Sequence, residues 1–315
     1  MTRPLAGRVA LVAGATRGAG RAIALELALA GATVYATGRS SRQRPAAESG
    51  GHDPFDLARR PETIEETAER IGMAGGAAIG LCVDHSREVE VSALIERIQH
   101  ESGRLDILVN DIWGGDQLCE WGKPLWECDV ARGFQLLERA LYTHIITSRH
   151  ALPLMLQQQA GLVVEVTDGV GLYYRSNTFY DLAKSSVTRL AFVCAEELRD
   201  KHITALAISP GFLRSEAMLD HFGVTEATWR EGIAKDEHFA YSETPRYVAR
   251  GIAALAADPQ RAAHSGKCYG SWQLQALYGF TDEDGAKPNW GEHAAACDFG
   301  KDQAESDQRF RAMFG

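Results

Sequence analysis

A short apolar run followed by a glycine-rich turn constrains the fold more than any other feature of the sequence. The run Val9–Ala13 leads into residues 14–20, GATRGAG, and then into a stretch with helical spacing of apolar residues. Glycines at three places in this turn allow the backbone to bend sharply and allow a pyrophosphate to approach the N–H groups at the helix start. This strand–turn–helix context predicts a dinucleotide-binding fold.

The rest of the chain alternates between short apolar runs and longer amphipathic stretches. Such alternation is typical of a parallel sheet covered by helices on both faces. The predicted strands are Val9–Ala13, Thr33–Thr37, Ala78–Val83, Ile107–Val109, Leu162–Val166 and Thr204–Ile208. The predicted helices are Arg21–Ala30, Glu62–Met73, Glu88–Gln99, Gly133–Gln157, Ser185–Leu198 and Arg246–Ala257. We therefore expect the α/β fold class, with a Rossmann-type, doubly wound parallel sheet.

Three segments interrupt this alternation. Residues 40–61 form a long polar loop, residues 213–245 carry scattered aromatic side chains, and residues 279–315 are polar without clear periodicity. We expect a single domain over residues 1–278, in which residues 213–245 form a substrate lid. Residues 279–315 are expected to be a C-terminal extension that wraps the domain, contacts a neighbouring subunit or is partly loose.

Charge at the end of the second predicted strand distinguishes the two nicotinamide dinucleotides. An acidic side chain there would hold the ribose hydroxyls and repel a 2′-phosphate. The sequence instead continues with Arg39 and Ser40. Together, Arg39 and Arg17 would bind a 2′-phosphate through charge-assisted hydrogen bonds. We therefore expect NADP(H) as the cofactor.

A tyrosine and a lysine are spaced for proton transfer. Tyr180 and Lys184 would lie on one face of a helix, one turn apart. A nearby ammonium stabilises phenolate and lowers the tyrosine pKa from its usual value of about 10. The pair would then exchange a proton with a carbonyl or alcohol oxygen near neutral pH. Thr167 and Asp168 precede the pair at a strand end, where Thr167 offers a hydroxyl to the substrate and Asp168 would have to be protonated to do so.

Two polar residues follow other predicted strands. Asp84 comes after the third strand, where it accepts a hydrogen bond from the adenine amino group or caps the next helix. Asn110 follows the fourth strand, at the carboxyl edge where ligands bind in sheets of this kind.

With these motifs, residues 5–270 resemble the short-chain dehydrogenase/reductase family. Ser209-Pro210-Gly211, followed by Ser215, is a further mark of the resemblance. The resemblance implies hydride transfer on nicotinamide, a catalytic tyrosine, and pairing of subunits into a homodimer or homotetramer. The catalytic residues that it implies or leaves open are Tyr180, Lys184, Thr167 and Asp168. The expected cofactor contacts are Gly14, Thr16, Arg17, Gly18, Gly20, Arg39, Ser40, Asp84, Asn110, Tyr180, Lys184, Pro210, Gly211 and Ser215.

The sequence departs from the family pattern at three places. Residues 110–113 read Asn-Asp-Ile-Trp instead of Asn-Asn-Ala-Gly, which puts the bulk of Trp113 beside the nicotinamide. Ala140 aligns with the helical asparagine that holds a proton-relay water. The usual serine is replaced: counting thirteen residues back from the tyrosine gives Thr167, which is slightly preferred, whereas aligning the S-x-x-G pattern gives Asp168.

Charge and cysteine content exclude other classes of protein. A net charge of −9 gives no field that attracts nucleic acid. The six cysteines include no C-x-x-C pair, so no metal site is predicted, and free thiols are typical of a reducing compartment. The sequence has no apolar run of the roughly 20 residues that span a membrane, and it leaves no room for a signal peptide before the first strand. We expect a cytoplasmic protein.

The expected function is an NADP(H)-dependent oxidoreductase that interconverts a carbonyl compound and an alcohol. An apolar or aromatic substrate is expected from side chains near the predicted pocket, although core packing explains them equally well. These aromatic residues are Trp113, Tyr173, Tyr174, Phe179, Phe212 and Trp229. The alternative is a nucleotide-sensing binding protein on the same fold, with catalysis degraded at Thr167/Asp168 and Ala140. Retention of the Tyr180–Lys184 pair argues against it.

Overall fold

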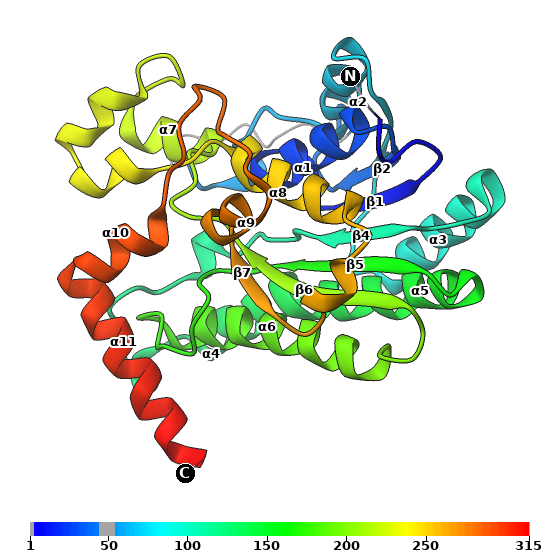
Figure 1. Ribbon diagram of the computed structural model, residues 1–315. Coiled ribbons are helices and arrows are strands. Elements are labelled where there is room, and N and C mark those ends of the chain that lie inside the picture. Colours follow the sequence, from blue (N-terminus) through cyan, green and yellow to red (C-terminus); the bar gives the residue numbers. More distant parts are fainter. Residues whose placement is uncertain (1–2, 44–53, 315) are drawn as a thin grey trace.

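The centre of the protein is a seven-stranded sheet in which all neighbouring strands pair in parallel (Figure 1). The computed structural model describes residues 3–43 and 54–314. The strands are β1 (Val9–Ala13), β2 (Thr33–Gly38), β3 (Ala77–Cys82), β4 (Ile107–Asn110), β5 (Gly161–Val166), β6 (Ile203–Ser209) and β7 (Cys268–Gly270). Their order is β3-β2-β1-β4-β5-β6-β7, so the predicted fold class is confirmed. The edge strand β7 was not predicted, because three residues are too few to show a pattern.

Helices cover both faces of the sheet (Figure 1). They are α1 (Gly18–Leu29), α2 (Ile64–Met73), α3 (Glu88–Ser102), α4 (Val130–Leu137), α5 (Thr143–Gln158), α6 (Thr178–Glu197), α7 (Glu216–Phe222), α8 (Pro245–Ala257), α9 (Ser271–Tyr278), α10 (Trp290–Ala296) and α11 (Asp298–Arg311). One face packs mainly against α1 and α8, the other against α3, α5 and α6. None of the helices in the described ranges combines the length and apolar character needed to cross a bilayer.

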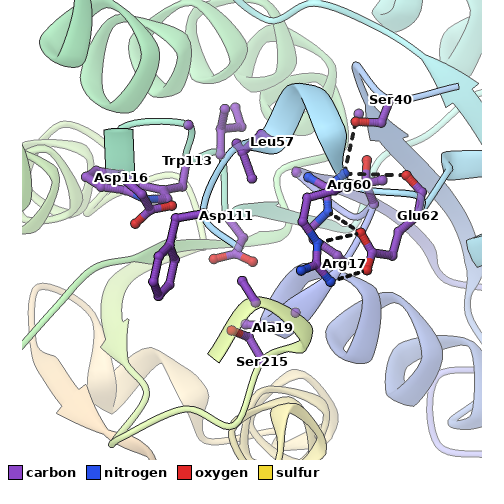
Figure 2. A pocket seen from close by; sticks show the side chains of 18 of the residues that line it. Arg17, Ala19, Ser40, Leu57, Arg60, Glu62, Asp111, Trp113, Asp116 and Ser215 are labelled. Atoms are coloured by element: carbon purple, nitrogen blue, oxygen red, sulfur yellow. Dashed lines mark hydrogen bonds and ion pairs between the residues drawn. The ribbon is translucent and has the colours of Figure 1, made fainter. Parts of the chain in front are cut away.

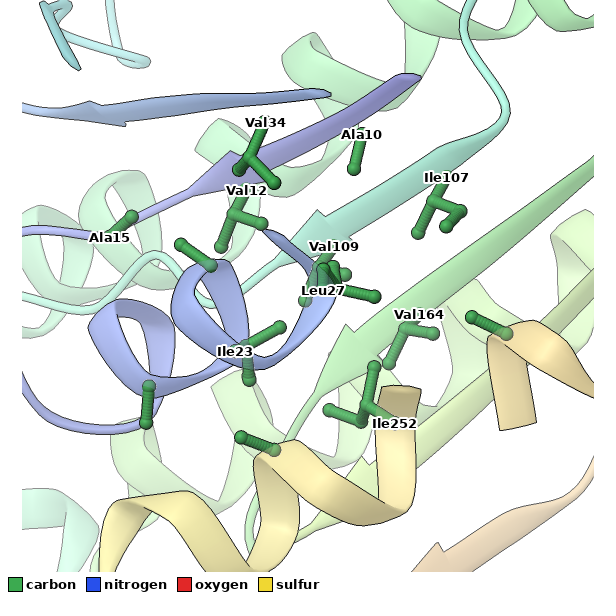
Figure 3. Close-up of a cluster of buried hydrophobic side chains, with 14 of the residues drawn as sticks. Ala10, Val12, Ala15, Ile23, Leu27, Val34, Ile107, Val109, Val164 and Ile252 are labelled. Atoms are coloured by element: carbon green, nitrogen blue, oxygen red, sulfur yellow. The ribbon is translucent and has the colours of Figure 1, made fainter. Parts of the chain in front are cut away.

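The core beneath α1 and α8 is built from small and branched aliphatic side chains (Figure 3). Ile23 and Leu27 of α1 and Ile252 of α8 pack against Val12 and Val164 of the sheet, and all five are fully buried. Burial of one such large side chain contributes about 1.5–3 kcal/mol. This packing fixes the start of α1 against the end of β1, where the glycine-rich turn lies.

The bounds of the other predicted helices differ by one to three residues at an end, whereas two predicted helices differ more strongly. The stretch predicted as one helix over Gly133–Gln157 is divided into α4 and α5 by a π-helical turn at Glu138–Tyr142, which contains the buried Ala140. The helix predicted to begin at Ser185 begins seven residues earlier, at Thr178. The reason is the cap: the side chain of Asn177 accepts a hydrogen bond from the N–H of Tyr180 at 2.9 Å.

The segment predicted as a lid is folded around its own aromatic cluster. It contains α7 and two 3₁₀ helices, Trp229–Ala234 and Glu237–Tyr241. Phe239 stacks on Phe222 with ring centroids 4.2 Å apart, and Trp229 meets Phe239 edge-on. The C-terminal extension, for which the sequence predicted no helix, contains α10 and α11. Residues 44–53 of the predicted polar loop lie outside the described residues.

Candidate active site

A cleft of about 1300 Å³ lies at the carboxyl ends of the central strands. The strand order changes direction between β1 and β4, which is where open α/β sheets bind ligands. Figure 2 shows Arg17, Arg60 and Glu62 on one side of this cleft and Trp113 on the other. The predicted site residues that line the cleft are Gly14, Thr16, Arg17, Gly18, Arg39, Ser40, Asp84, Thr167, Asp168, Tyr180, Lys184, Pro210, Gly211 and Ser215.

The glycine-rich turn has the shape that a diphosphate group needs. Gly14 and Gly18 have φ angles of +91° and +55°, and a side chain at Gly14 would collide with the carbonyl oxygen of Asp111. The N–H of Gly18, at the start of α1, donates to Oε2 of Glu216 at 2.8 Å. A carboxylate thus occupies the position at this helix start that suits an anion. Glu216 would have to move aside before a diphosphate could occupy this position.

The predicted arginines belong to a larger network of charges. Arg17 donates to Glu62 at 3.1 Å and to the hydroxyl of Ser40 at 3.0 Å. Glu62 also accepts from Arg60, whose guanidinium reaches Asp220 of α7. Glu62 therefore neutralises part of the positive charge that the sequence predicted for a 2′-phosphate. Its partnership with Arg17 was not predicted, since the two residues lie 45 positions apart.

Asn110 and Gly20 differ from the other predicted cofactor contacts, because neither lines the cleft. The fully buried Asn110 amide donates to Ser148 at 3.0 Å and to Glu165 at 2.8 Å, so the expected cofactor contact of this side chain is not what the structure shows. Gly20 allows close approach of α1 to the turn, because a side chain there would collide with the carbonyl oxygen of Gly14.

Asp84 lines the cleft and shapes the turn before α3. Its Oδ1 accepts hydrogen bonds from the N–H and the hydroxyl of Ser86, at 3.0 and 2.8 Å. The residue preceding α3 is Arg87, so Asp84 is not the cap of that helix. Its place in the cleft remains compatible with the contact to adenine predicted from the sequence.

A buried histidine–glutamate pair orders the chain after β4. Nδ1 of His144 lies 2.6 Å from Oε2 of Glu165, and its Nε2 lies 3.0 Å from the carbonyl oxygen of Ile112. Both side chains are almost completely buried, and His144 lies on α5 directly after the π-helical turn. The pair therefore holds the backbone that carries Trp113 into the cleft. The pair was not predicted, because the sequence pattern around His144 indicates only a helix and that around Glu165 only a strand.

Tyr180 and Lys184 lie together in the cleft on the first turns of α6. The hydroxyl of Tyr180 donates to Oδ2 of Asp168 at 2.8 Å. Nζ of Lys184 lies 4.1 Å from the centroid of the Trp113 ring and 5.6 Å from that of Tyr180. Phenol, ammonium and carboxyl groups thus gather at the carboxyl end of β5.

The hydroxyl of Thr167 is turned away from this group. It donates to the backbone carbonyl oxygen of Lys184 at 2.8 Å and accepts from Thr188 at 3.2 Å. The slight preference for Thr167 over Asp168 therefore does not match the geometry. Counting residues back from Tyr180 fails here because the loop between β5 and α6 does not keep the expected length, as the S-x-x-G alignment with Asp168 had indicated.

Burial dominates the electrostatics of the site. Burial, and next the charge of Asp168 and the hydrogen bond to it, raise the pKa of Tyr180 well above its ordinary value. The predicted lowering of this pKa by Lys184 is thus not the net effect in this structure. Burial lowers the pKa of Lys184, opposed by the charges of Asp168 and Asp111. Burial also raises the pKa of Asp111 to about 7.

Aromatic side chains form much of the wall around Tyr180. Trp113 meets its ring edge-on at 5.5 Å, and Trp121 lies 5.1 Å from it. Trp290, from the C-terminal extension, lines the cleft and meets Phe212 edge-on at 5.5 Å. The other aromatic residues predicted near the pocket, Tyr173, Tyr174, Phe179 and Trp229, do not line the cleft.

Sequence comparison indicates the same family as the glycine-rich turn and the Tyr180–Lys184 pair. A family model described as short chain dehydrogenase matches residues 46–222. The chain is 34% identical over 290 residues to dehydrogenase/reductase SDR family member 1 of Mus musculus, covering 90% of this chain and 86% of that protein. The chain belongs to the short-chain dehydrogenase/reductase family. The V-A-L-V-x-G-A-T-R-G type of opening indicates the branch of dehydrogenase/reductase member one, and this resemblance is confirmed.

Solved structures of the short-chain dehydrogenase/reductase family share the fold. A 7α-hydroxysteroid dehydrogenase complexed with NADH and 7-oxo glycochenodeoxycholic acid is 22% identical, with a TM-score of 0.66 over 90% of this chain and 97% of that one. A metagenomic short-chain oxidoreductase in complex with NADP is 23% identical, with a TM-score of 0.60 over 81% and 93%. The family makes this chain an oxidoreductase with a nucleotide-binding Rossmann fold.

Proposed function

We propose that this oxidoreductase uses NADP(H) to interconvert a carbonyl compound and an alcohol, with Tyr180 as the proton-transfer residue. One observation carries the proposal: the hydroxyl of Tyr180 and the ammonium of Lys184 enter the cleft from the same helix, at the carboxyl edge of the sheet. Asp168, bonded to that hydroxyl, takes the place beside the substrate oxygen.

Cofactor binding involves the glycine-rich turn and both arginines. The diphosphate would lie against the N–H groups at the start of α1, and Arg17 with Arg39 would contact the 2′-phosphate. Arg39 is exposed and follows β2, whereas Arg17 is already paired with Glu62. Arg39 is therefore the cation better placed to favour NADP(H) over NAD(H).

The protonation of Tyr180 favours the reductive direction. A bound nicotinamide dinucleotide supplies the hydride for reduction or accepts it in oxidation. Because its pKa lies well above the ordinary value, Tyr180 stays protonated at neutral pH and serves as a proton donor to a developing alkoxide. Lys184 supplies a positive charge near the oxygen that receives the proton. The carboxyl group of Asp168 would oppose negative charge on that oxygen unless it moves away.

The cleft walls support an apolar or aromatic carbonyl substrate. Trp113 lines the cleft and meets the phenol ring edge-on, and Trp121 lies against the same ring. Phe212, just before the lid, and Trp290, from the extension, also line the cleft. Large apolar surfaces with a few polar groups at one end are typical of pockets that bind such molecules.

We also propose domain boundaries, an oligomeric state and a cellular compartment for this protein. Residues 1–278 form the catalytic domain with a lid at 213–245, and residues 279–315 form an extension. Exposed apolar side chains on and around α4 and α5, such as Phe134 at 61% and Ile145 at 44%, support a homodimer or homotetramer. Six free cysteines fit the reducing cytoplasm.

The contact between Asp168 and Tyr180 also favours a second candidate, a nucleotide-sensing protein with weakened catalysis. A carboxylate beside the phenol opposes negative charge on a substrate oxygen. This candidate predicts NADPH binding without turnover of any carbonyl in a broad panel.

The test compares the wild-type protein with Tyr180→Phe. We expect wild type to bind NADPH more tightly than NADH and to oxidise NADPH with an aromatic ketone or aldehyde. Tyr180→Phe should lower kcat/KM on the order of 10²–10⁴-fold because the proton donor is lost, while the Kd for NADPH and the melting temperature stay unchanged. Full activity in Tyr180→Phe would refute the mechanism, and absence of turnover in wild type would favour the sensing candidate.

A further inference from the structure

We propose that His238, His293 and Cys297 form a zinc-binding site that joins the C-terminal extension to the lid. His238 lies in the 3₁₀ helix Glu237–Tyr241, whereas His293 lies on α10 and Cys297 ends it. None of the three residues lines the cofactor cleft. The cysteine spacing predicted no metal, because a ligand set that combines one cysteine with two histidines from distant segments leaves no local motif.

The three ligand atoms have the separations that a tetrahedral zinc ion requires. Nδ1 of His238 lies 3.0 Å from Nε2 of His293, and Sγ of Cys297 lies 3.6 Å from the same nitrogen. All three atoms lie within 4.8 Å of one another. Zinc bonds of about 2.0–2.1 Å to nitrogen and about 2.3 Å to sulfur place two nitrogens about 3.3 Å apart and nitrogen and sulfur about 3.6 Å apart. An ion therefore fits after only small side-chain movements.

The ligand side chains are held in place by their surroundings. The ring of His293 stacks on Tyr241, with centroids 3.7 Å apart and an interplanar angle of 11°. His238 lies edge-on to Phe299 at 5.1 Å, and its backbone N–H donates to Asp236 at 2.9 Å. His293 and Cys297 lie four residues apart, one turn along the helix. All three ligands are half-buried, so an ion can enter from solvent.

The ligand types select among metals. Two imidazoles and a thiolate suit zinc, whereas magnesium and calcium prefer sets of oxygen ligands. The i,i+4 spacing on α10 brings Sγ of Cys297 beside the His293 ring, and the lid adds Nδ1 of His238 as the third ligand atom from a distant segment. Three protein ligands leave a fourth zinc position for water.

Zinc at this site would fix one wall of the substrate cleft. Trp290 lies on α10 one turn before His293, lines the cleft, and contacts Phe212, which directly precedes the lid. A side chain at Gly211 would lie 2.8 Å from Cβ of Trp290, so α10 is closely packed against a residue predicted as a cofactor contact. Metal binding would therefore order the extension over the cleft.

The experiment measures metal binding directly, so its result does not depend on the proposed oxidoreductase activity. Full-length protein is stripped with a chelator and titrated with Zn²⁺ or Co²⁺ under reducing conditions. We expect one equivalent of either ion to bind, and the Co²⁺ form to show a thiolate-to-cobalt charge-transfer band. Zn²⁺ should also slow proteolytic cleavage between the lid and the extension.

Two ligand variants and a matched thiol control make the result specific. Cys297→Ser should abolish the charge-transfer band, and His238→Gln should weaken Zn²⁺ binding by more than about 100-fold, because loss of even an outer-shell partner costs 10–100-fold. Cys128→Ser, which removes another free cysteine, should bind like wild type. The site is refuted if wild type binds no Zn²⁺ or if folded Cys297→Ser and His238→Gln, checked by circular dichroism, both bind it normally.

Discussion

Asp168 is the residue that changes the chemistry expected of a tyrosine–lysine pair. Its Oδ2 accepts the hydrogen bond of the Tyr180 hydroxyl, which would otherwise be directed to a substrate oxygen. After burial, its charge is the largest cause that raises the pKa of Tyr180. The ammonium of Lys184 lies over an indole ring and does not offset these effects. The carboxyl group therefore keeps the phenol protonated and a poor general base.

Replacing this carboxyl group should shift the pH dependence of catalysis. In Asp168→Ser, the pKa of Tyr180 should fall, because a charge that disfavours phenolate is gone. Alcohol oxidation requires phenolate and rises with pH, so its rise should begin at lower pH in the variant. The measurement is kcat/KM for alcohol oxidation against pH, with Asp168→Asn as a neutral variant of similar size. Identical profiles in all three proteins would show that Asp168 does not control the tyrosine.

Glu216 occupies the anion position of the glycine-rich turn, so its charge should oppose cofactor binding. Its Oε2 accepts from the N–H of Gly18, and its Oε1 lies 3.5 Å from a nitrogen of Arg21. In Glu216→Gln the like-charge repulsion with a diphosphate disappears, and we expect the Kd for NADPH to fall about tenfold. Fluorescence titration measures it, with exposed Glu231→Gln on the same lid as the control. Unchanged or weaker binding in Glu216→Gln alone would contradict this expectation.

The residues predicted from the sequence are those with a local motif. The glycines of the turn and the pair at 180 and 184 have fixed spacings and neighbouring strands, so their roles can be predicted. Glu62 and Glu216 have no such motif. Each enters the cleft because tertiary packing brings a distant segment to the turn, a contact that periodicity cannot predict.

At the level of elements, the buried apolar strands were predicted well and the polar C-terminal helices were not. β1 agrees residue for residue with its prediction, because β-branched residues buried on both faces leave a clear pattern. α11 is a mostly exposed helix with few apolar residues, and in its C-terminal half it contacts the chain after β5: Asp307 accepts from the N–H of Leu172. Such a helix has no strong amphipathic pattern to detect.

The start of α6 is the element boundary on which the site depends. Asn177 is buried, and its side chain caps the helix by accepting from the N–H of Tyr180. In Asn177→Ala the first turn should fray, which lowers the free energy of unfolding by about 1 kcal/mol and moves the phenol. Asp129→Ala removes the exposed cap of α4 and serves as the control. Urea denaturation and kcat/KM should show similar stability losses in both variants and a larger activity loss in Asn177→Ala; equal activity losses would contradict the role of this cap.

At the level of the whole molecule, the buried carboxyl groups link stability to pH. Burial raises the pKa of Glu243 from 4.5 to about 8, and that of Asp111 from 3.8 to about 7. Glu243 accepts a hydrogen bond from Ser271, the first residue of α9, and its carboxyl group packs against Gly211. It therefore connects α9 to the segment after β6 that lines the cleft. Both groups therefore bind a proton in the folded protein at pH values where the unfolded chain has already lost it.

The sign of the effect follows from this excess of bound protons. Where the folded state holds more protons than the unfolded state, the free energy of unfolding falls as pH rises, by up to about 1.4 kcal/mol per pH unit for each group. For Glu243 this window extends from about 4.5 to about 8. Glu243→Gln removes the titrating group, so its stability should decline less across the window than that of wild type. Urea denaturation across the window tests this, with exposed Glu231→Gln as control; parallel declines in all three proteins would mean that Glu243 does not carry the excess proton.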